Sequence, residues 1–266
     1  MSEQIFSPLP DLGTRSDEIT IFAGPCSVES QEQFDEVAEC VSGLGLKWIR
    51  GGAFKPRTNP HSFQGLGEEA LKIMRDAGEK YGLLTLTEVM DSAHCELVHS
   101  YVDGLQVGAR NFQNFSLLKK IGQVTADSHK MVLYKRGFAG TIAEWLAATD
   151  YITDLGNDNV VLCERGIRTF ETATRFTLDI AAVPVIHKQS LYPVCIDVSH
   201  PAGQRDLVPS LAKAAVAAGA DSLMIEVHPN PPAALSDGPQ QLTPLQFEAL
   251  VAELRELADV LGKKIV

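Results

Sequence analysis

The chain has no long hydrophobic run and few cysteines. None of its apolar segments approaches the ~20 residues that a membrane-spanning helix needs. Its first 18 residues contain neither the basic segment nor the apolar segment of a secretory signal. The five cysteines are an odd number without framework spacing, which favours a reduced protein over a disulfide-stabilised one. We therefore expect a cytoplasmic protein that does not insert into a membrane.

Basic residues are also scarce relative to acidic ones. The chain of 266 residues has 23 Lys and Arg against 34 Asp and Glu, which gives a formal net charge of −11. Nucleic-acid binding needs a basic face that neutralises phosphates, so this balance argues against a nucleic-acid partner. Hydrophobic residues make up 45% of the chain and charged residues 21%, which is ordinary globular composition with enough apolar material for a large core.

Short apolar runs rich in Val, Ile and Leu recur along the whole chain. Their spacing of roughly 30 residues is that of a strand–helix unit. Most of the runs are almost continuously apolar, as expected for strands that are buried on both faces. The eight predicted strands are Ile19–Ala23, Lys47–Gly51, Leu83–Val89, Gly104–Val107, Met131–Tyr134, Val160–Cys163, Val194–Asp197 and Ser222–Glu226.

Helix signals lie in the gaps between these strands. Capping-box patterns predict helix starts, and a proline in the first helical position suits its fixed φ. The signals are capping boxes at Ser30–Gln33, Thr141–Glu144 and Thr243–Gln246, N-cap candidates at Asp91 and Asn114, and an alanine-rich helical run at Leu207–Ala218.

The alternation of eight strands with helices predicts an α/β fold, a single closed (β/α)8 TIM barrel. Such barrels commonly have ~250 residues, and an open doubly wound sheet is the alternative. The chain has no linker-like tract and no change of composition. We therefore expect one catalytic barrel at residues 19–266, preceded by a short N-terminal arm at residues 1–18.

Cationic side chains follow several of the predicted strands. In a barrel the carboxyl ends of all strands meet on one face, which carries the active site. Local positive charge in an anionic protein indicates a small, highly charged anion, and guanidinium groups suit carboxylate and phosphate. The alternative is that some cations form structural ion pairs with Glu88, Glu164 or Glu226. The cations are Arg50, Lys55, Arg57, Arg110, Lys135 and Arg165.

Four further side chains at this face could bind a metal. Taken alone, Cys26 could be a small buried apolar residue, and His200 could be an ordinary core histidine. Together with Glu226 and Asp237 they supply one thiolate, one imidazole and two carboxylates. This mixture of soft and hard ligands fits Mn²⁺, Fe²⁺, Co²⁺ or Zn²⁺ better than Mg²⁺ or Ca²⁺, and does not choose among the first four.

An ordered series of motifs resembles one known family. The sequence resembles the phosphoenolpyruvate-dependent 3-deoxy-arabino-heptulosonate 7-phosphate (DAHP) synthases, of the short type Iβ branch that is shared with the octulosonate-phosphate synthases. The resemblance extends from about residue 21 to residue 250. Its motifs are GPCS at 24–27, RGGAFKPRT at 50–58, SFQGLGEEAL at 62–71, GARNFQNFSLL at 108–118, KRG at 135–137, CERGIRTFET at 163–172, DVSH at 197–200 and EVHPNPPAALSDGPQQL at 226–242.

The resemblance implies a role for each group of site residues. It implies a (β/α)8 homo-oligomer, a dimer or a tetramer, that holds one divalent metal ion through Cys26, His200, Glu226 and Asp237. It implies that phosphoenolpyruvate is bound by Arg50, Lys55, Ala109, Arg110, Lys135 and Arg165, and that erythrose 4-phosphate is received by Lys55, Pro56, Arg57 and Thr58.

The loop at residues 55–58 distinguishes the two branches of this family. Heptulosonate synthases have a Lys-Pro-Arg-Ser/Thr loop, as this sequence does, whereas octulosonate synthases have a Lys-Ala-Asn-Arg type loop. Erythrose 4-phosphate is therefore the expected acceptor. Two departures from the family pattern leave acceptor preference and subunit contacts open: Asn59, where serine is expected, and the stretch His187–Tyr192.

The implied reaction is the condensation of phosphoenolpyruvate, erythrose 4-phosphate and water to DAHP and phosphate, the first step of the shikimate pathway to aromatic amino acids. The metal would act as a Lewis acid on the aldehyde oxygen. We expect Lys135, its pKa lowered by neighbouring cations, to transfer a proton, and Asp197 and His200 are further candidates for a proton relay.

Three other functions are compatible with parts of this pattern. They are an octulosonate-phosphate synthase that uses arabinose 5-phosphate, a phosphosugar-binding barrel without turnover, and a metal-dependent aldolase that cleaves reversibly and releases no phosphate. Because only about 18 residues precede the first predicted strand, too few for a regulatory domain, we expect no intrinsic feedback inhibition by tyrosine or phenylalanine.

Overall fold

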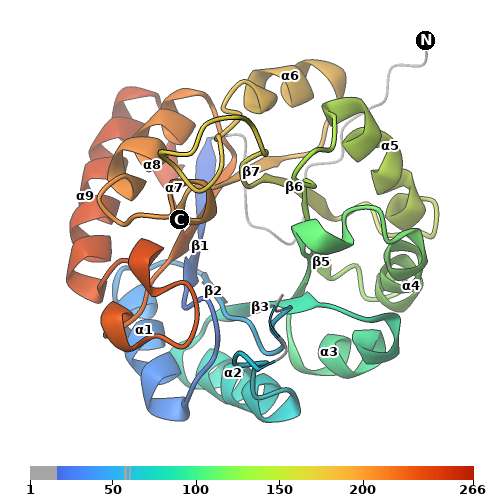
Figure 1. The fold of residues 1–266 in the computed structure, drawn as a ribbon, viewed down its shortest axis with the longest axis horizontal. Helices are drawn as coiled ribbons and strands as arrows, with labels where there is room; N and C mark the ends of the chain where they lie inside the picture. Colours follow the sequence, from blue (N-terminus) through green and yellow to red (C-terminus); the bar gives the residue numbers. More distant parts are fainter. Residues whose placement is uncertain (1–16, 57–58, 60) are drawn as a thin grey trace.

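Eight parallel strands form a closed barrel that is surrounded by helices (Figure 1). The computed structural model describes residues 17–56, 59 and 61–266. Of the N-terminal arm expected at residues 1–18, residues 1–16 lie outside the described residues. The barrel strands are β1 Glu18–Gly24, β2 Trp48–Arg50, β3 Leu84–Val89, β4 Gly104–Val107, β5 Met131–Lys135, β6 Val160–Glu164, β7 Val194–Asp197 and β8 Ser222–Glu226.

The sheet closes because β1 pairs with strands on both of its sides. Phe22 is in register with Trp48 of β2 and with Met224 of β8, and all the other neighbours pair in chain order. A short strand, β9 Lys264–Ile265, adds to the outer part of β1. The closed order confirms the predicted TIM barrel and rules out the open doubly wound sheet. The eight predicted strands agree with the observed ones to within one residue at each end.

Helices cover the outside of the barrel (Figure 1). Each lies in a connection between two barrel strands, except the last, α9, which lies between β8 and the short strand β9. The α-helices are α1 Gln31–Gly43, α2 Glu68–Tyr81, α3 Cys95–Tyr101, α4 Phe115–Thr125, α5 Ile142–Thr153, α6 Ala182–Gln189, α7 Ser199–Ala202, α8 Val208–Ala217 and α9 Pro244–Val260. The 3₁₀ turns are η1 Ser92–His94, η2 Ala109–Asn111, η3 Pro231–Ala233 and η4 Gly238–Gln240.

Most of the predicted helix starts are confirmed. Complete capping boxes begin α5 and α9, Asn114 caps α4, and Asp91 caps η1 directly before α3. The box predicted at Ser30–Gln33 is only half formed. Ser30 accepts from the backbone N–H of Gln33, but the Gln33 side chain accepts from the N–H of Glu29 instead of Ser30. The reciprocal bond therefore closes one residue earlier than the pattern predicts.

The strands are apolar on both faces because each separates two layers of core. On β1, Ile19, Ile21 and Ala23 pack outward against helices, whereas Phe22 lies inside the barrel with Trp48. This alternation follows from the two-residue period of a strand. A fully buried large apolar side chain contributes about 2–3 kcal/mol, so both layers are substantial sources of stability. The inner layer is Phe22, Trp48, Leu86, Met131, Leu133, Val161, Cys163, Cys195 and Met224.

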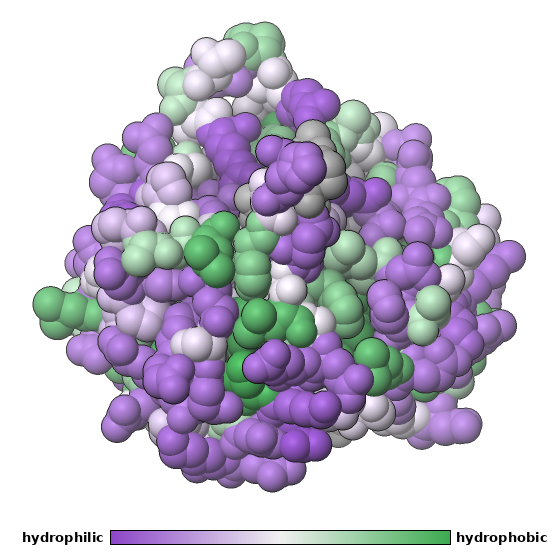
Figure 2. All heavy atoms as spheres, turned by 60° about the horizontal axis from the view of Figure 1, so that its bottom comes forward, coloured by the Kyte–Doolittle hydropathy of each residue, from purple (hydrophilic) through white to green (hydrophobic). Residues whose placement is uncertain are grey.

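The surface is mainly hydrophilic, with a few apolar side chains gathered near the middle of the face in Figure 2. No helix in the described part of the chain has the length and apolarity that crossing a membrane requires.

Candidate active site

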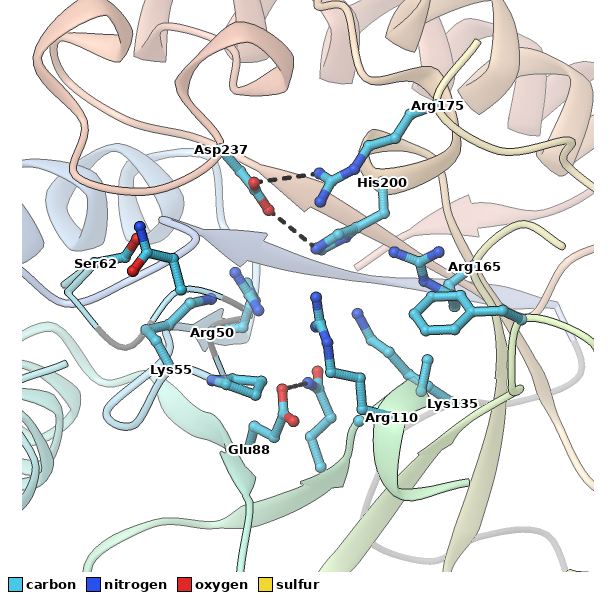
Figure 3. Close-up of a pocket in the computed structure, with 16 residues that line it drawn as sticks. Arg50, Lys55, Ser62, Glu88, Arg110, Lys135, Arg165, Arg175, His200 and Asp237 are labelled. Carbon is cyan, nitrogen blue, oxygen red and sulfur yellow. Dashed lines mark hydrogen bonds and ion pairs between the residues drawn. The ribbon is translucent and has the colours of Figure 1, made fainter. Parts of the chain in front are cut away.

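The carboxyl ends of the strands meet around one polar cavity of about 310 Å³. Figure 3 shows Arg50, Arg110, Lys135 and Arg165 extending from different strand ends toward the same space. Strand directions are parallel, so residues far apart in the chain are brought to one rim. The cavity is lined by Arg50, Lys55, Pro56, Asn59, Ser62, Glu88, Gln106, Gly108, Ala109, Arg110, Lys135, Phe138, Arg165, Arg175, His200 and Asp237.

Four potential metal ligands meet at one side of this cavity. One ligand atom from each of Cys26, His200, Glu226 and Asp237 lies within 4.8 Å of the others. The Nε2 atom of His200 is 3.5 Å from a Glu226 oxygen and 3.7 Å from an Asp237 oxygen. The Sγ atom of Cys26 is 3.4 Å from the same Asp237 oxygen. These are the four residues that the sequence nominated, and the structure brings all of them together.

A buried glutamine, Gln241, connects the two segments that carry Cys26 and Asp237. Gln241 accepts a hydrogen bond from the backbone N–H of Cys26 at 3.0 Å and donates one to the carbonyl of Ser236 at 2.8 Å. Ser236 directly precedes Asp237, whose backbone is left-handed with φ 50°. Gln241 therefore fixes the segment after β1 and the segment after β8 relative to each other.

The buried carboxylate of Asp197 orients His200. His200 lies on α7, and its Nδ1 is 2.7 Å from an oxygen of Asp197, the last residue of β7. The same oxygen accepts from the Lys135 ammonium at 2.7 Å. Because Nδ1 is engaged by Asp197, Nε2 is the atom directed at the other ligands. A carboxylate in this position is a common partner of a metal-binding histidine.

Burial sets the protonation of these ligands. It raises the pKa of the Cys26 thiol to about 12, with the Glu226 carboxylate contributing in the same direction. Burial also lowers the pKa of His200, against the attraction of Asp197 and Glu226. The imidazole is therefore neutral, as a metal ligand must be, while the thiol needs a nearby cation in order to ionise. One thiol, one imidazole and two carboxylates fit a transition-type divalent ion.

Two of the cations belong to the metal side of the cavity. The Arg50 guanidinium donates to a Glu226 oxygen at 3.2 Å and to the Pro25 carbonyl at 2.8 Å, and its buried Nε has no partner among the described residues. The Lys55 ammonium is 3.0 Å from the Cys26 sulfur. The predicted alternative of a structural ion pair therefore applies in part to Arg50, through Glu226.

Arg165 belongs to the opposite side and is held differently. Arg165 is only 5% exposed, and its buried Nη1 has no hydrogen-bond partner within the described part of the chain. A buried guanidinium with a free donor is costly unless an anion completes it. Together with the exposed Arg110 on η2 and the backbone of Ala109, it provides donors for a carboxylate or phosphate.

The structure corrects the expectation for Lys135. Burial is the largest single influence on this ammonium group and lowers its pKa, but the attraction and hydrogen bond of Asp197, together with Cys163, outweigh burial, so the pKa of Lys135 is raised rather than lowered. Burial likewise opposes ionisation of Asp197, but His200 and Lys135 hold its pKa well below the ordinary range. Lys135 and Asp197 are therefore a charged pair. The sequence places cations near Lys135 but cannot show which carboxylate is closest.

Sequence reasoning missed a further cation of the cavity, Arg175. It lies between β6 and α6, 3.2 Å from an Asp237 oxygen, and donates to Gln240 at 2.8 Å. Gln240 in turn donates to Glu226 at 2.6 Å. The only signal was position, because the long segment after β6 belongs to the active rim. Nothing local distinguishes Arg175 from Arg168 in the same segment.

Two predicted residues cannot be placed. Arg57 and Thr58 lie outside the described residues, whereas Lys55 and Pro56 line the cavity as expected. Arg136 follows Lys135 but faces away from the cavity, where it pairs with Glu164 and Asp179 at 3.0 and 2.7 Å.

The fold and this site define a class: a (β/α)8 barrel with a polar cavity at the carboxyl ends of its strands, in which a group of potential metal ligands adjoins a cluster of cations. Residues 12–262 match the DAHP synthetase I family. The chain belongs to this family.

Individual relatives agree with this assignment. The chain is 51% identical to the phospho-2-dehydro-3-deoxyheptonate aldolase of Thermotoga maritima over 257 residues, 97% of this chain and 75% of that protein. A 2-dehydro-3-deoxyphosphooctonate aldolase of Caulobacter vibrioides is 34% identical over 262 residues, 90% of this chain and 87% of the relative.

Solved structures are similar over nearly the whole chain. The crystal structure of the Thermotoga phospho-2-dehydro-3-deoxyheptonate aldolase (DAHP synthase) has a TM-score of 0.92 and 50% identity, covering 97% of this chain and 74% of that one. A truncated form of the 3-deoxy-D-arabino-heptulosonate 7-phosphate synthase from the same organism has a TM-score of 0.89 and 47% identity, covering 98% and 94%.

Proposed function

We propose that this chain is a metal-dependent DAHP synthase, which condenses phosphoenolpyruvate with erythrose 4-phosphate and water and releases inorganic phosphate. Family membership and the heptonate-type relatives support this reaction class. One observation carries the proposal: a four-ligand group of metal-binding type lies beside a set of cations in a single cavity. The reaction needs both parts, because it brings two anions together and develops negative charge on an aldehyde oxygen.

The metal site we propose is formed by Cys26, His200, Glu226 and Asp237. A divalent ion held there would supply Lewis acidity to the aldehyde oxygen of the acceptor. Asp197 supports the site by fixing Nδ1 of His200, and Arg175 partly neutralises Asp237. Mn²⁺, Fe²⁺, Co²⁺ and Zn²⁺ all remain compatible with this donor set.

The phosphoenolpyruvate site we propose is formed by Arg50, Lys55, Ala109, Arg110, Lys135 and Arg165. The free donors of Arg50 and Arg165 support it, because they are buried and would be satisfied by substrate oxygens. These cations reduce the repulsion between the two substrates and stabilise the departing phosphate. Carbon 3 of phosphoenolpyruvate attacks the aldehyde carbon, water adds at carbon 2, and the hemiketal phosphate then loses phosphate.

We assign the proton transfers to Lys135, Asp197 and His200. Lys135 is charged through its pair with Asp197, which favours proton donation by Lys135 over abstraction. Asp197 and His200 are in contact with each other at 2.7 Å and could relay a proton.

The acceptor site we propose is Lys55, Pro56, Arg57 and Thr58. Lys55 and Pro56 line the cavity, and the identity of the loop favours erythrose 4-phosphate. The decisive experiment is a phosphate-release assay with phosphoenolpyruvate and either erythrose 4-phosphate or arabinose 5-phosphate, in the presence of Mn²⁺. We expect phosphate release with the former.

The alternatives give distinct results in the same assay. Turnover with arabinose 5-phosphate alone would establish the octulosonate branch, which the 34% identical relatives represent. Binding without phosphate release would establish a non-catalytic barrel, and reversible cleavage of a phosphosugar without phosphate release would establish an aldolase. We also propose a homo-oligomer, dimer or tetramer, which sedimentation analysis would test.

A further inference from the structure

Two stacked phenylalanines lie beside the anion-binding arginines. Phe138 follows β5 and Phe176 lies between β6 and α6; their ring centroids are 5.2 Å apart and the rings are nearly parallel, at 7°. The guanidinium carbon of Arg165 is 4.9 Å from the centroid of Phe138 and 4.2 Å from that of Phe176. Both distances are within the range of a cation–π contact.

Other arginines gather around the same pair of rings. The guanidinium carbons of Arg110 and Arg168 are 6.0 and 5.5 Å from the Phe138 centroid, and that of Arg175 is 5.9 Å from the Phe176 centroid. With Arg165, four cations therefore surround one aromatic pair. Cations repel each other, and the electron-rich ring faces offset part of this repulsion.

The rings take the place that carboxylates take elsewhere in this protein. Arg136, which directly follows Lys135 but does not line the cavity, is held by Glu164 and Asp179. Arg165 is buried to the same degree, but its Nη1 has no partner among the described residues. A carboxylate would occupy the N–H groups of an arginine, whereas a ring face attracts the guanidinium and leaves its in-plane N–H donors free.

The position of Phe176 is fixed by its local backbone. Ile167 and Thr177 exchange backbone hydrogen bonds of 2.9 and 3.0 Å, and the N–H of Phe176 donates to the Pro201 carbonyl. Gly166 has φ +90°, and a Cβ there would lie 2.7 Å from the Cβ of Phe176. A side chain at position 166 would therefore displace the ring that contacts Arg165.

We infer that Phe138 and Phe176 are positioning residues that hold Arg165 in place while leaving its N–H donors free for the carboxylate or phosphate of phosphoenolpyruvate. This inference rests on the proposed function, because it takes that anion as the ligand of Arg165. It gives two aromatic side chains a role in positioning a cation of the proposed phosphoenolpyruvate site.

The test compares the direct binding of phosphoenolpyruvate to variants, measured by calorimetry on the Mn²⁺-loaded protein. Phe176→Leu keeps an apolar side chain but removes the ring face, and we expect affinity to fall by about three- to tenfold, with KM for phosphoenolpyruvate rising and kcat changing less. Phe176→Tyr keeps the ring and is expected to bind like the wild type. Phe138→Leu removes the other ring and is expected to resemble Phe176→Leu.

Phe115→Leu is the matched control, since it breaks another stacked pair, Phe115 and Tyr151 at 4.6 Å, between α4 and α5. It is expected to leave binding unchanged, and thermal unfolding shows whether each variant is folded. Arg165→Lys keeps the charge but loses the planar group that stacks. In that background Phe176→Leu should cost little further affinity, because the rings act through Arg165.

Two results would overturn the inference while leaving the proposed function intact. One is wild-type affinity in folded Phe176→Leu and Phe138→Leu; the other is an undiminished loss of affinity when Phe176→Leu is added to Arg165→Lys. A wild-type protein that binds no phosphoenolpyruvate would overturn the proposed function and this inference with it.

Discussion

At the scale of single residues, the candidate metal site combines a thiol that burial keeps protonated with an imidazole that burial keeps neutral. Both protonation states suit a site that binds a divalent ion, because a bound cation stabilises the thiolate and a neutral imidazole can coordinate the ion.

Cys26→Ala is expected to remove metal-dependent turnover while leaving the barrel folded, since the change is small and the other three ligands cannot complete the site. The measurements are phosphate release, elemental analysis of the purified protein and circular dichroism. Cys40→Ala is the control, because Cys40 is only partly buried and its sulfur faces Glu248, outside the cavity. Near-normal activity of metal-free Cys26→Ala would contradict the Lewis-acid role.

At the scale of elements, the site depends on how the segments after β1 and β8 are joined. Gln241 links Cys26 to Ser236, and Ser236 also shares a hydrogen bond of 2.7 Å with Ser27. Glu29 accepts from Ser27 and from the N–H of Leu235. These bonds hold two ligand-bearing segments, more than 200 residues apart in sequence, in one arrangement.

Gln241→Leu is expected to lower the affinity for Mn²⁺ by about tenfold or more, the usual effect of removing a residue that orients metal ligands. The reason is that Cys26 and Asp237 would no longer be fixed relative to each other. Titration of the metal-free protein with Mn²⁺ measures the change. Gln123→Leu, on the exposed side of α4, provides the control. Equal affinities of the two variants would show that this connection is not needed.

The loop after β2 supports a second prediction at this scale. Arg57→Ala is expected to raise KM for erythrose 4-phosphate much more than KM for phosphoenolpyruvate, because it removes a cation proposed to bind the acceptor phosphate. Steady-state kinetics with each substrate varied in turn measures both constants. Equal effects on the two constants would contradict the assignment of the loop at residues 55–58 to the acceptor.

At the scale of the whole molecule, charge is distributed unevenly. The chain has a net charge of −11, yet six cations line one cavity: Arg50, Lys55, Arg110, Lys135, Arg165 and Arg175. A low-dielectric barrel concentrates their field on a small anion. The barrel itself is held by its two apolar layers and does not depend on the metal ligands for its core.

Removal of metal with a chelator is therefore expected to abolish turnover without unfolding the barrel. The far-ultraviolet circular dichroism should be unchanged, while Tm falls because the metal binds only the folded state. The stabilisation lost is about 2.7 kcal/mol at a metal concentration of 100 times Kd. Re-addition of Mn²⁺ should restore both activity and Tm. Full activity after verified metal removal would contradict a metal-dependent reaction.

Much of the fold and of the candidate site could be predicted from residue patterns. The strand positions followed from continuous apolar runs, since barrel strands are buried on both faces. The four ligands followed from their chemistry and their place after strands. The capping box at Ser30 was wrong in one bond, because the Gln33 side chain reached Glu29. Such a choice between neighbouring N–H groups depends on local backbone geometry.

The sequence by itself determined the barrel, the four candidate metal ligands and the presence of cations at one rim, because these depend on residue type and period. Tertiary structure alone decided which charges meet. It pairs Lys135 with Asp197 and so raises the pKa of Lys135, and it brings Arg175 to Asp237. It also places Phe138 and Phe176 against Arg165. Such contacts join segments that are distant in the chain, and their distances are set by packing rather than by any local pattern.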